Sequence, residues 1–238
     1  MGLKLYKFSQ FTIPVCALIF LVILSGCSFK NFSLMNLAKS EIDVVADYHY
    51  MEVESLLKEL TAKLYKRNPK YLNSKIKSNG QTFAIKDRLE NIFGSPGKIN
   101  MHGISEHGIA AIELSLDGEF QGDRVFVFMA GLTEMVRKSY GYRHDFFIHN
   151  ALKEQDLYLS ARNLEIALWR ITSFKSESGD PLILTNSRDG ETENLSYERL
   201  FGKMISLQDM LAKIMSGKNN RIIKTVVKKV ATTAFFPF

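Results

Sequence analysis

Four of the five histidines fall between residues 102 and 149. Histidine is a common zinc ligand, so a metal site is the first chemistry to consider here. His107 follows His102 by five positions, and His149 follows His144 by five positions. A helix brings together side chains that are three or four residues apart, and the His-Glu-x-x-His motif is absent. The spacing therefore predicts ordinary turn or surface histidines and no metal site.

Residues suited to hydrolysis are also scattered along the chain. Neither a Gly-x-Ser-x-Gly elbow nor a glycine-rich phosphate loop is present. Two carboxylate pairs, Glu113 with Asp117 and Glu154 with Asp156, could serve a hydrolase of cell-wall glycan. Because the sequence shows no charge partner that would shift their pKa values, we expect solvated surface pairs. The sequence gives no support for an enzyme or for a cofactor.

The N-terminus has the parts of a secretory signal. Lys4 and Lys7 give it a positive start, and the residues from Phe11 to Leu24 are an almost unbroken apolar run. As a helix this run would extend about 21 Å, which is short of the roughly 30 Å of hydrocarbon in a bilayer. Pro14 further disfavours a straight spanning helix. A cleaved signal peptide over residues 1–26 is therefore expected.

The signal ends in Leu24-Ser25-Gly26-Cys27, which resembles the lipobox of bacterial lipoprotein precursors. The resemblance implies that a signal peptidase cleaves before Cys27 and that this cysteine carries a lipid that holds the protein on a membrane. Ser28 stands where an aspartate would imply retention at the inner membrane, so the resemblance implies the outer membrane, facing the periplasm. The alternative is an uncleaved anchor in which Cys27 is as incidental as Cys16.

Composition limits what the mature chain can be. No cysteine follows Cys27, so this residue is available for attachment and the domain has no disulfide. The signal holds two of the 31 basic residues and none of the 25 acidic ones, which leaves a mature net charge of +4. That charge is too small to indicate a nucleic-acid partner. Residues 27–39 are expected to form a short lipidated tether.

Apolar residues recur at spacings of three and four through most of residues 40–238. The pattern predicts an all-α fold, a single multi-helix bundle or helical array of about six to seven helices. A polar loop with a short apolar patch, 182–184, is expected at 176–194. The expected helices span residues 41–67, 83–93, 105–116, 123–140, 154–174, 196–215 and 220–231.

The centre of the predicted core is the run from Val125 to Leu132, which is apolar on every side. Periodicity alone cannot separate a buried helix from a buried strand here, but the following residues turn amphipathic at helical spacing and favour helix. Gly131 then marks a point at which a neighbouring helix comes close. Gly141 offers a C-cap, and Gly217 is expected to stop a later helix.

An aromatic loop follows the central helix. Its mixture of aromatic and charged side chains suits a protein interface. We expect a partner from the cell envelope to bind there, and the function expected from the whole sequence is that of a non-enzymatic binding or scaffold component of an envelope assembly. The loop residues concerned are Tyr142, Arg143, His144, Asp145, Phe146 and Phe147.

The last predicted helix is basic on one side. Such a helix could bind an anionic membrane surface, which gives a further alternative function. The interpretation that we favour is a bundle helix whose polar face is rich in lysine, with Phe235–Phe238 closing the core. Its basic residues are Lys218, Arg221, Lys224, Lys228 and Lys229.

Overall fold

The computed structural model describes residues 41–73, 83–95, 98–143, 152–187, 190–192, 194–219, 222–224 and 234–238. Within these ranges the chain has seven helices and no strand, so the all-α prediction is confirmed. Six of the helices are substantial. They are α2 (Glu41–Arg67), α3 (Lys70–Asn73), α4 (Ile85–Phe93), α5 (Gly108–Ser115), α6 (Arg124–Ser139), α7 (Glu154–Ser173) and α8 (Ser196–Asn219).

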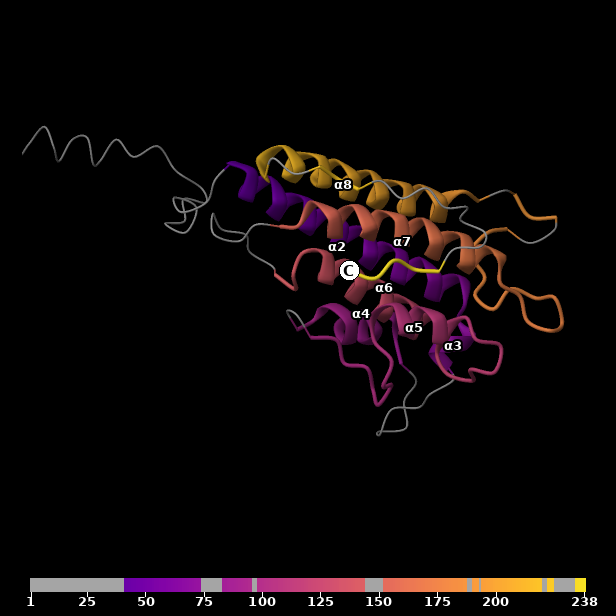
Figure 1. Cartoon of the computed structure of the whole chain (residues 1–238). Coiled ribbons are helices and arrows are strands. Elements are labelled where there is room, and N and C mark those ends of the chain that lie inside the picture. Colours follow the sequence, from indigo (N-terminus) through magenta and orange to yellow (C-terminus); the bar gives the residue numbers. More distant parts are fainter. Residues whose placement is uncertain are drawn as a thin grey trace, which may run out of the picture. The chain divides into compact units, whose positions relative to one another are not determined.

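Two helix pairs organise this part of the chain. The long helices α7 and α8 pack against each other, and α2 packs against α8 and α6 (Figure 1). The short helix α5 packs along α6, to which the turn at 116–123 connects it, and α4 contacts both α2 and α6. Helix α6 is therefore the element that joins the long helices to the shorter ones.

Helix α6 lies at the centre of the core. Of its 16 residues 14 are buried, and these include the whole run from Val125 to Leu132. The helix was the favoured prediction for this run, and the strand alternative is wrong. Asp123 begins the helix, because its Oδ1 accepts a hydrogen bond of 2.9 Å from the amide of Phe126. An apolar surface on every side of the helix lets elements pack around it in all directions.

The predicted close approach at Gly131 is present between α6 and α5. A Cβ atom built on Gly131 would lie 2.5 Å from the carbonyl oxygen of Gly108 and 2.9 Å from the amide nitrogen of Ile112. Both are backbone atoms, so they cannot move aside as a flexible side chain would. Glycine at this position is what allows the two helices to pack this closely.

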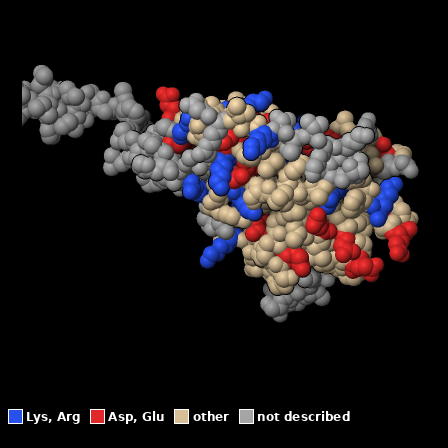
Figure 2. All heavy atoms as spheres, in the orientation of Figure 1, with Lys and Arg blue, Asp and Glu red and all other residues tan. Residues whose placement is uncertain are grey.

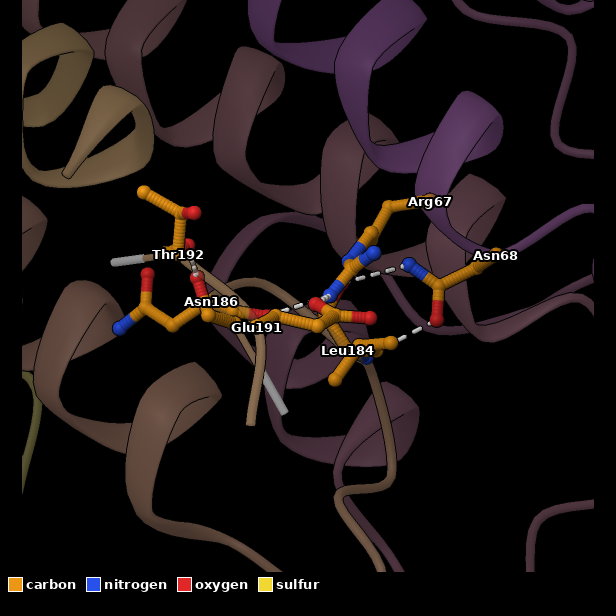
Figure 3. A network of polar contacts seen from close by, with 7 residues as sticks. Arg67, Asn68, Leu184, Asn186, Glu191 and Thr192 are labelled. Carbon is orange, nitrogen blue, oxygen red and sulfur yellow. Dashed lines mark hydrogen bonds and ion pairs between the residues drawn. The ribbon is translucent and has the colours of Figure 1, made fainter. Parts of the chain in front are cut away.

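The loop after α7 is fastened to the end of α2, as Figure 3 shows. The Asn68 side chain donates to the carbonyl of Leu184 at 2.8 Å and accepts from the amide of Leu184 at 2.8 Å. Arg67 binds the Asn186 carbonyl at 3.1 Å and pairs with Glu191. The predicted apolar patch lies inside this loop, and Ile183 within it is fully buried.

The prediction of a last helix over 220–231 is wrong at residues 222–224, which are the part of that range that the structure describes. Helix α8 continues through Gly217 to Asn219, and residues 222–224 are not helical. The Gln155 side chain binds both backbone groups of Lys224, accepting from its amide at 2.8 Å and donating to its carbonyl at 3.1 Å. Asparagines 219 and 220 favour a helix end, since their side chains compete for backbone hydrogen bonds. Gly217, which was expected to stop the preceding helix, lies inside α8.

The C-terminal aromatic residues lie along α7 and beside α6 (Figure 1). Asn163 holds the Phe236 backbone from both sides, accepting from its amide at 2.7 Å and donating to its carbonyl at 2.9 Å. Phe235 is 7% exposed, with the Arg170 guanidinium 4.5 Å from the centre of its ring. Phe235 lies in the core, and Phe236 and Phe238 pack against it, so this part of the favoured interpretation agrees with the structure, whereas its helix does not at 222–224.

The predicted signal peptide (1–26) and tether (27–39) lie outside the described residues. None of the helices from α2 to α8 is both long enough and apolar enough to cross a membrane.

Candidate functional site

A groove opens at the end of the α5–α6 hairpin where α5 begins and α6 ends. It comprises two adjoining pockets of about 300 Å³ and about 270 Å³, which share three lining residues. We call it the open-end groove, and the turn at 116–123 is then the closed end of the hairpin. The shared residues are His107, Glu134 and Tyr142. The first pocket adds Gly108, Ile109, Ala110, Met135, Lys138, Pro237 and Phe238, and the second adds Lys98, Ile99 and Arg137.

Glu134 joins the two helices at this end. Its Oε2 accepts a hydrogen bond of 3.0 Å from the amide of Gly108, the first residue of α5, and lies 3.0 Å from Nδ1 of His107. A carboxylate at a helix N-terminus is stabilised by the free amides and by the helix dipole. Gly108 adopts a φ of +53°, which glycine allows at little cost. The carboxylate of Glu134 is thus already engaged by the protein.

Tyr142 reaches the groove because of the way α6 ends. The amide of Gly141 donates to the Lys138 carbonyl and that of Tyr142 donates to the Arg137 carbonyl, each at 2.8 Å. This is a Schellman motif, and the φ of +65° at Gly141 fits the predicted glycine cap. Tyr142 itself has a φ of +58°, which is uncommon for a residue with a side chain. Burial raises the pKa of the Tyr142 phenol, and the charge of Glu134 adds to this effect.

Arg137 lies in the wall of the smaller pocket and is almost completely buried, with 2% of its surface exposed. Its nearest carboxylate is that of Glu54 on α2, 3.5 Å from Nη2. On the other side its guanidinium lies 5.8 Å from the centre of the Phe93 ring. A buried guanidinium keeps its charge, and Glu54 supplies the counter-charge here.

The charges in view in Figure 2 are unevenly distributed. Lys and Arg side chains gather mainly toward the end where α6 ends and α7 begins, whereas Asp and Glu side chains gather mainly toward the opposite end. Lys98 and Lys138 add two ammonium groups to the groove lining, in which Glu134 is the one acidic residue among those described. The open-end groove therefore favours a negatively charged ligand.

Of the predicted partner-binding loop, the structure describes two residues. Tyr142 lines the open-end groove, and Arg143 is exposed beside it. His144, Asp145, Phe146 and Phe147 lie outside the described residues. Sequence reasoning did not single out Glu134, Arg137 or Lys138. The sequence contains one signal that could have indicated Arg137: it is a charged residue in a helix that is predicted to be buried, and charged residues are rarely buried without a partner.

The predicted basic surface is only partly described. Lys218 pairs with the buried carboxylate of Asp43 at 3.2 Å, which holds α8 against α2. Lys224 is bound through its backbone to Gln155. Arg221, Lys228 and Lys229 lie outside the described residues, and so does the lipidation candidate Cys27.

The other candidate groups have contacts that hold the fold together. His102 packs between the rings of Phe83 and Phe126, at 5.9 Å and 5.6 Å between ring centres. Glu113 pairs with Arg170 at 3.3 Å, and Glu154 accepts a hydrogen bond of 2.9 Å from Asn219. Within the described ranges no three potential metal ligands of the His, Cys, Asp or Glu type come together.

Chemically, the open-end groove combines an apolar floor with a cluster of donors, an arrangement typical of ligand-binding sites. Comparisons of the chain with protein-family models, with curated proteins and with solved structures gave no match.

Proposed function

We propose that this protein is a bacterial envelope lipoprotein, anchored through lipid on Cys27 to the outer membrane and facing the periplasm. In this proposal it is a non-enzymatic binding component of an envelope assembly. The single observation that carries the anchor is the sequence Leu24-Ser25-Gly26-Cys27 at the end of an apolar run that is short for a membrane span. The open-end groove supports the binding role, since it offers charged and apolar side chains on two helices that pack against each other.

The anchor is tested by replacing each cysteine in turn. We expect Cys27→Ser to abolish incorporation of labelled palmitate and to leave a precursor that is no longer processed as a lipoprotein. Cys16→Ser is the matched control, because Cys16 lies inside the segment to be removed and should keep full labelling. Labelling that persists in Cys27→Ser would reject the anchor, and fractionation of the membranes then tests the outer-membrane location separately.

The binding role is tested by affinity purification from solubilised membranes. We expect the wild-type protein to recover one stoichiometric partner, and Tyr142→Asn to lose it. Asparagine tolerates a positive φ, so this change removes the aromatic ring from the groove without straining the backbone. Tyr48→Asn is the control, because Tyr48 is 68% exposed on α2 and does not line the groove. Equal recovery by both variants would contradict a binding role for the open-end groove.

A further inference from the structure

The segment at 234–238, which we call the strap, is held on α7 through its backbone. The amide of Phe236 donates to Oδ1 of Asn163 at 2.7 Å, and its carbonyl accepts from Nδ2 of Asn163 at 2.9 Å. Asn163 is 0% exposed, so a completely buried side chain uses both of its polar atoms on this one backbone position. In many peptide-binding sites, main-chain hydrogen bonds of this kind supply affinity and pockets for side chains supply specificity.

The strap also places aromatic rings beside positive groups. The Arg170 guanidinium lies 4.5 Å from the centre of the Phe235 ring, and the Lys138 ammonium lies 5.7 Å from that of Phe238. Arg170 and Asn163 are seven positions apart on α7, so they share one face and lie about two turns apart. The strap therefore runs from Arg170 past Asn163 toward the end of α6 (Figure 1).

The strap is less completely buried than the other segment that an asparagine binds from both sides. In the loop after α7, Asn68 binds both backbone groups of Leu184, and the adjacent Ile183 is fully buried. In the strap only Phe235 of the five residues is buried, and Pro237 is exposed. Segments with few buried contacts open at a lower free-energy cost than the whole protein. We therefore expect the strap to leave α7 while the helices stay folded.

The strap leaves the open-end groove unfilled. Pro237 and Phe238 belong to the lining of the first pocket, so an open volume of about 300 Å³ remains next to them. Glu134 in this lining accepts through Oε2 and keeps Oε1 as a further acceptor, and Lys138 supplies donors. A peptide that continued past the position of Phe238 would find both acceptors and donors there. Such a peptide would make the contacts of the strap and add those of the groove.

We infer that the α7 surface under the strap and the open-end groove form one extended site for an aromatic segment of the partner polypeptide, with the strap as its internal competitor. Asn163 binds the backbone of the partner segment, and an aromatic ring of the segment lies against Arg170. The segment continues into the groove, where Lys98 and Lys138 favour an acidic residue. This inference rests on the proposed binding role of the groove and not on the lipid at Cys27.

The first experiment measures binding of a labelled probe peptide, Ala-Phe-Phe-Pro-Phe with both ends capped, to the full-length protein in a neutral detergent. Phe235→Ser weakens the strap as a competitor and keeps the α7 surface. We therefore expect this variant to bind the probe at least about tenfold more tightly than the wild type does. Phe238→Ser, which keeps the buried Phe235, should give a smaller gain of a few-fold.

Phe120→Ser is the matched control for the gain in affinity. Phe120 is a partly buried ring that also lies beside an arginine, 5.7 Å from the Arg124 guanidinium, but it is at the closed end of the hairpin. This variant should bind the probe as the wild type does. Equal binding by Phe235→Ser and the wild type, the same gain in Phe120→Ser, or binding by none of the proteins would overturn the inference.

Modified probes test the contact with Asn163. An ester in place of the amide of the second phenylalanine removes the hydrogen that Phe236 donates to Asn163 and keeps every side chain. We expect this ester to bind Phe235→Ser at least about tenfold more weakly than the amide does, and Asn163→Ala to remove the difference. An ester at the first phenylalanine is the control, because Asn163 binds the amide of Phe236. Equal weakening by the two esters would contradict recognition of the backbone by Asn163.

A longer probe, Ala-Phe-Phe-Pro-Phe-Gly-Asp with both ends capped, tests whether the site continues into the groove. We expect it to bind Phe235→Ser several-fold more tightly than the short probe does. Tyr142→Asn in the same background should reduce this gain, because Tyr142 lines the groove. Equal binding of the long and short probes would overturn the extended site.

The same variants separate this inference from its alternatives. A dimer of the wild type that Phe235→Ser abolishes, measured by analytical ultracentrifugation, would assign the site to the strap of a second copy and overturn the partner segment. Failure of every probe, while Tyr142→Asn still loses the partner in affinity purification, would reject this inference and leave the proposed binding role of the groove standing.

Discussion

Arg124 and Arg137 are buried at opposite ends of α6, and their surroundings differ. At the closed end of the hairpin, Arg124 donates to the carbonyls of Ser115 and Gly118, each at 2.9 Å, and also to that of Asp117. These carbonyls lie where α5 ends, so the guanidinium satisfies acceptors that the helix leaves free and complements its dipole. At the open end, Nη2 of Arg137 lies 3.5 Å from the Glu54 carboxylate, and its guanidinium lies 5.8 Å from the centre of the Phe93 ring. The same side chain is thus held by backbone carbonyls at one end of α6, and by a carboxylate and an aromatic ring from other helices at the other end.

The largest expected effect comes from removing the two arginines separately. Arg124→Met leaves three backbone carbonyls without their donor and should lower the free energy of unfolding by about 3 kcal/mol. Arg137→Met removes a charge that has few hydrogen bonds, and Glu54 keeps its contacts with Lys58 and Tyr50. The free energy of unfolding should therefore change by no more than about 1 kcal/mol. Urea denaturation measures both. A loss for Arg137→Met as large as that for Arg124→Met would make Arg137 a structural residue and break the comparison.

An intermediate effect is expected where the two helices touch. Gly131→Ala would place a Cβ 2.5 Å from the Gly108 carbonyl oxygen, so the helices must separate, and we expect a loss of about 2 kcal/mol. Gly202→Ala on α8 is the matched control, because nothing lies within 4 Å of its added Cβ. The better helix propensity of alanine should make that variant more stable by up to about 1 kcal/mol. Thermal denaturation of the two variants checks that their stabilities change in opposite directions. A Gly131→Ala variant that is more stable than the wild type would show that α5 is free to shift.

The smallest expected effect on stability concerns His49. Its imidazole is buried, like the guanidinium of Arg137, but unlike the guanidinium it can lose its charge. Burial lowers the pKa of His49 below its ordinary value of 6.5, so the unfolded chain binds the proton more readily. Stability is therefore complete above about pH 6.5 and should fall as the pH drops below that value. Denaturation midpoints between about pH 7.5 and about pH 5.5 measure the slope, and His49→Gln should flatten it. An unchanged slope in His49→Gln would assign the effect to other groups.

The helical periodicity located most of the fold. Helix α2 spans residues 41–67 as predicted, and α6 differs from its predicted bounds by one residue at each end. Helix α2 has a strong apolar period, and α6 turns amphipathic after its apolar run. Both have clear end signals, at Pro69 and at Gly141. The prediction was wrong at 222–224, because the contacts of Lys224 with Gln155 join residues that are 69 positions apart. A local pattern contains no information on such a contact.

The sequence by itself determined the helical class and the buried centre at α6, because both depend on side chains a few residues apart. It also marked Gly131 as a point of close approach, but only the tertiary structure decided that the neighbouring helix is α5. It also contains the signal and lipobox pattern on which the proposed anchor depends. Only the tertiary structure decided which groups meet at the open end of the hairpin. There the α6 residues Glu134 and Arg137 meet the first residue of α5, Lys98 and the terminal Phe238. The reason is physical. A buried guanidinium needs partners close to it, and these partners come from elements that are distant in the chain.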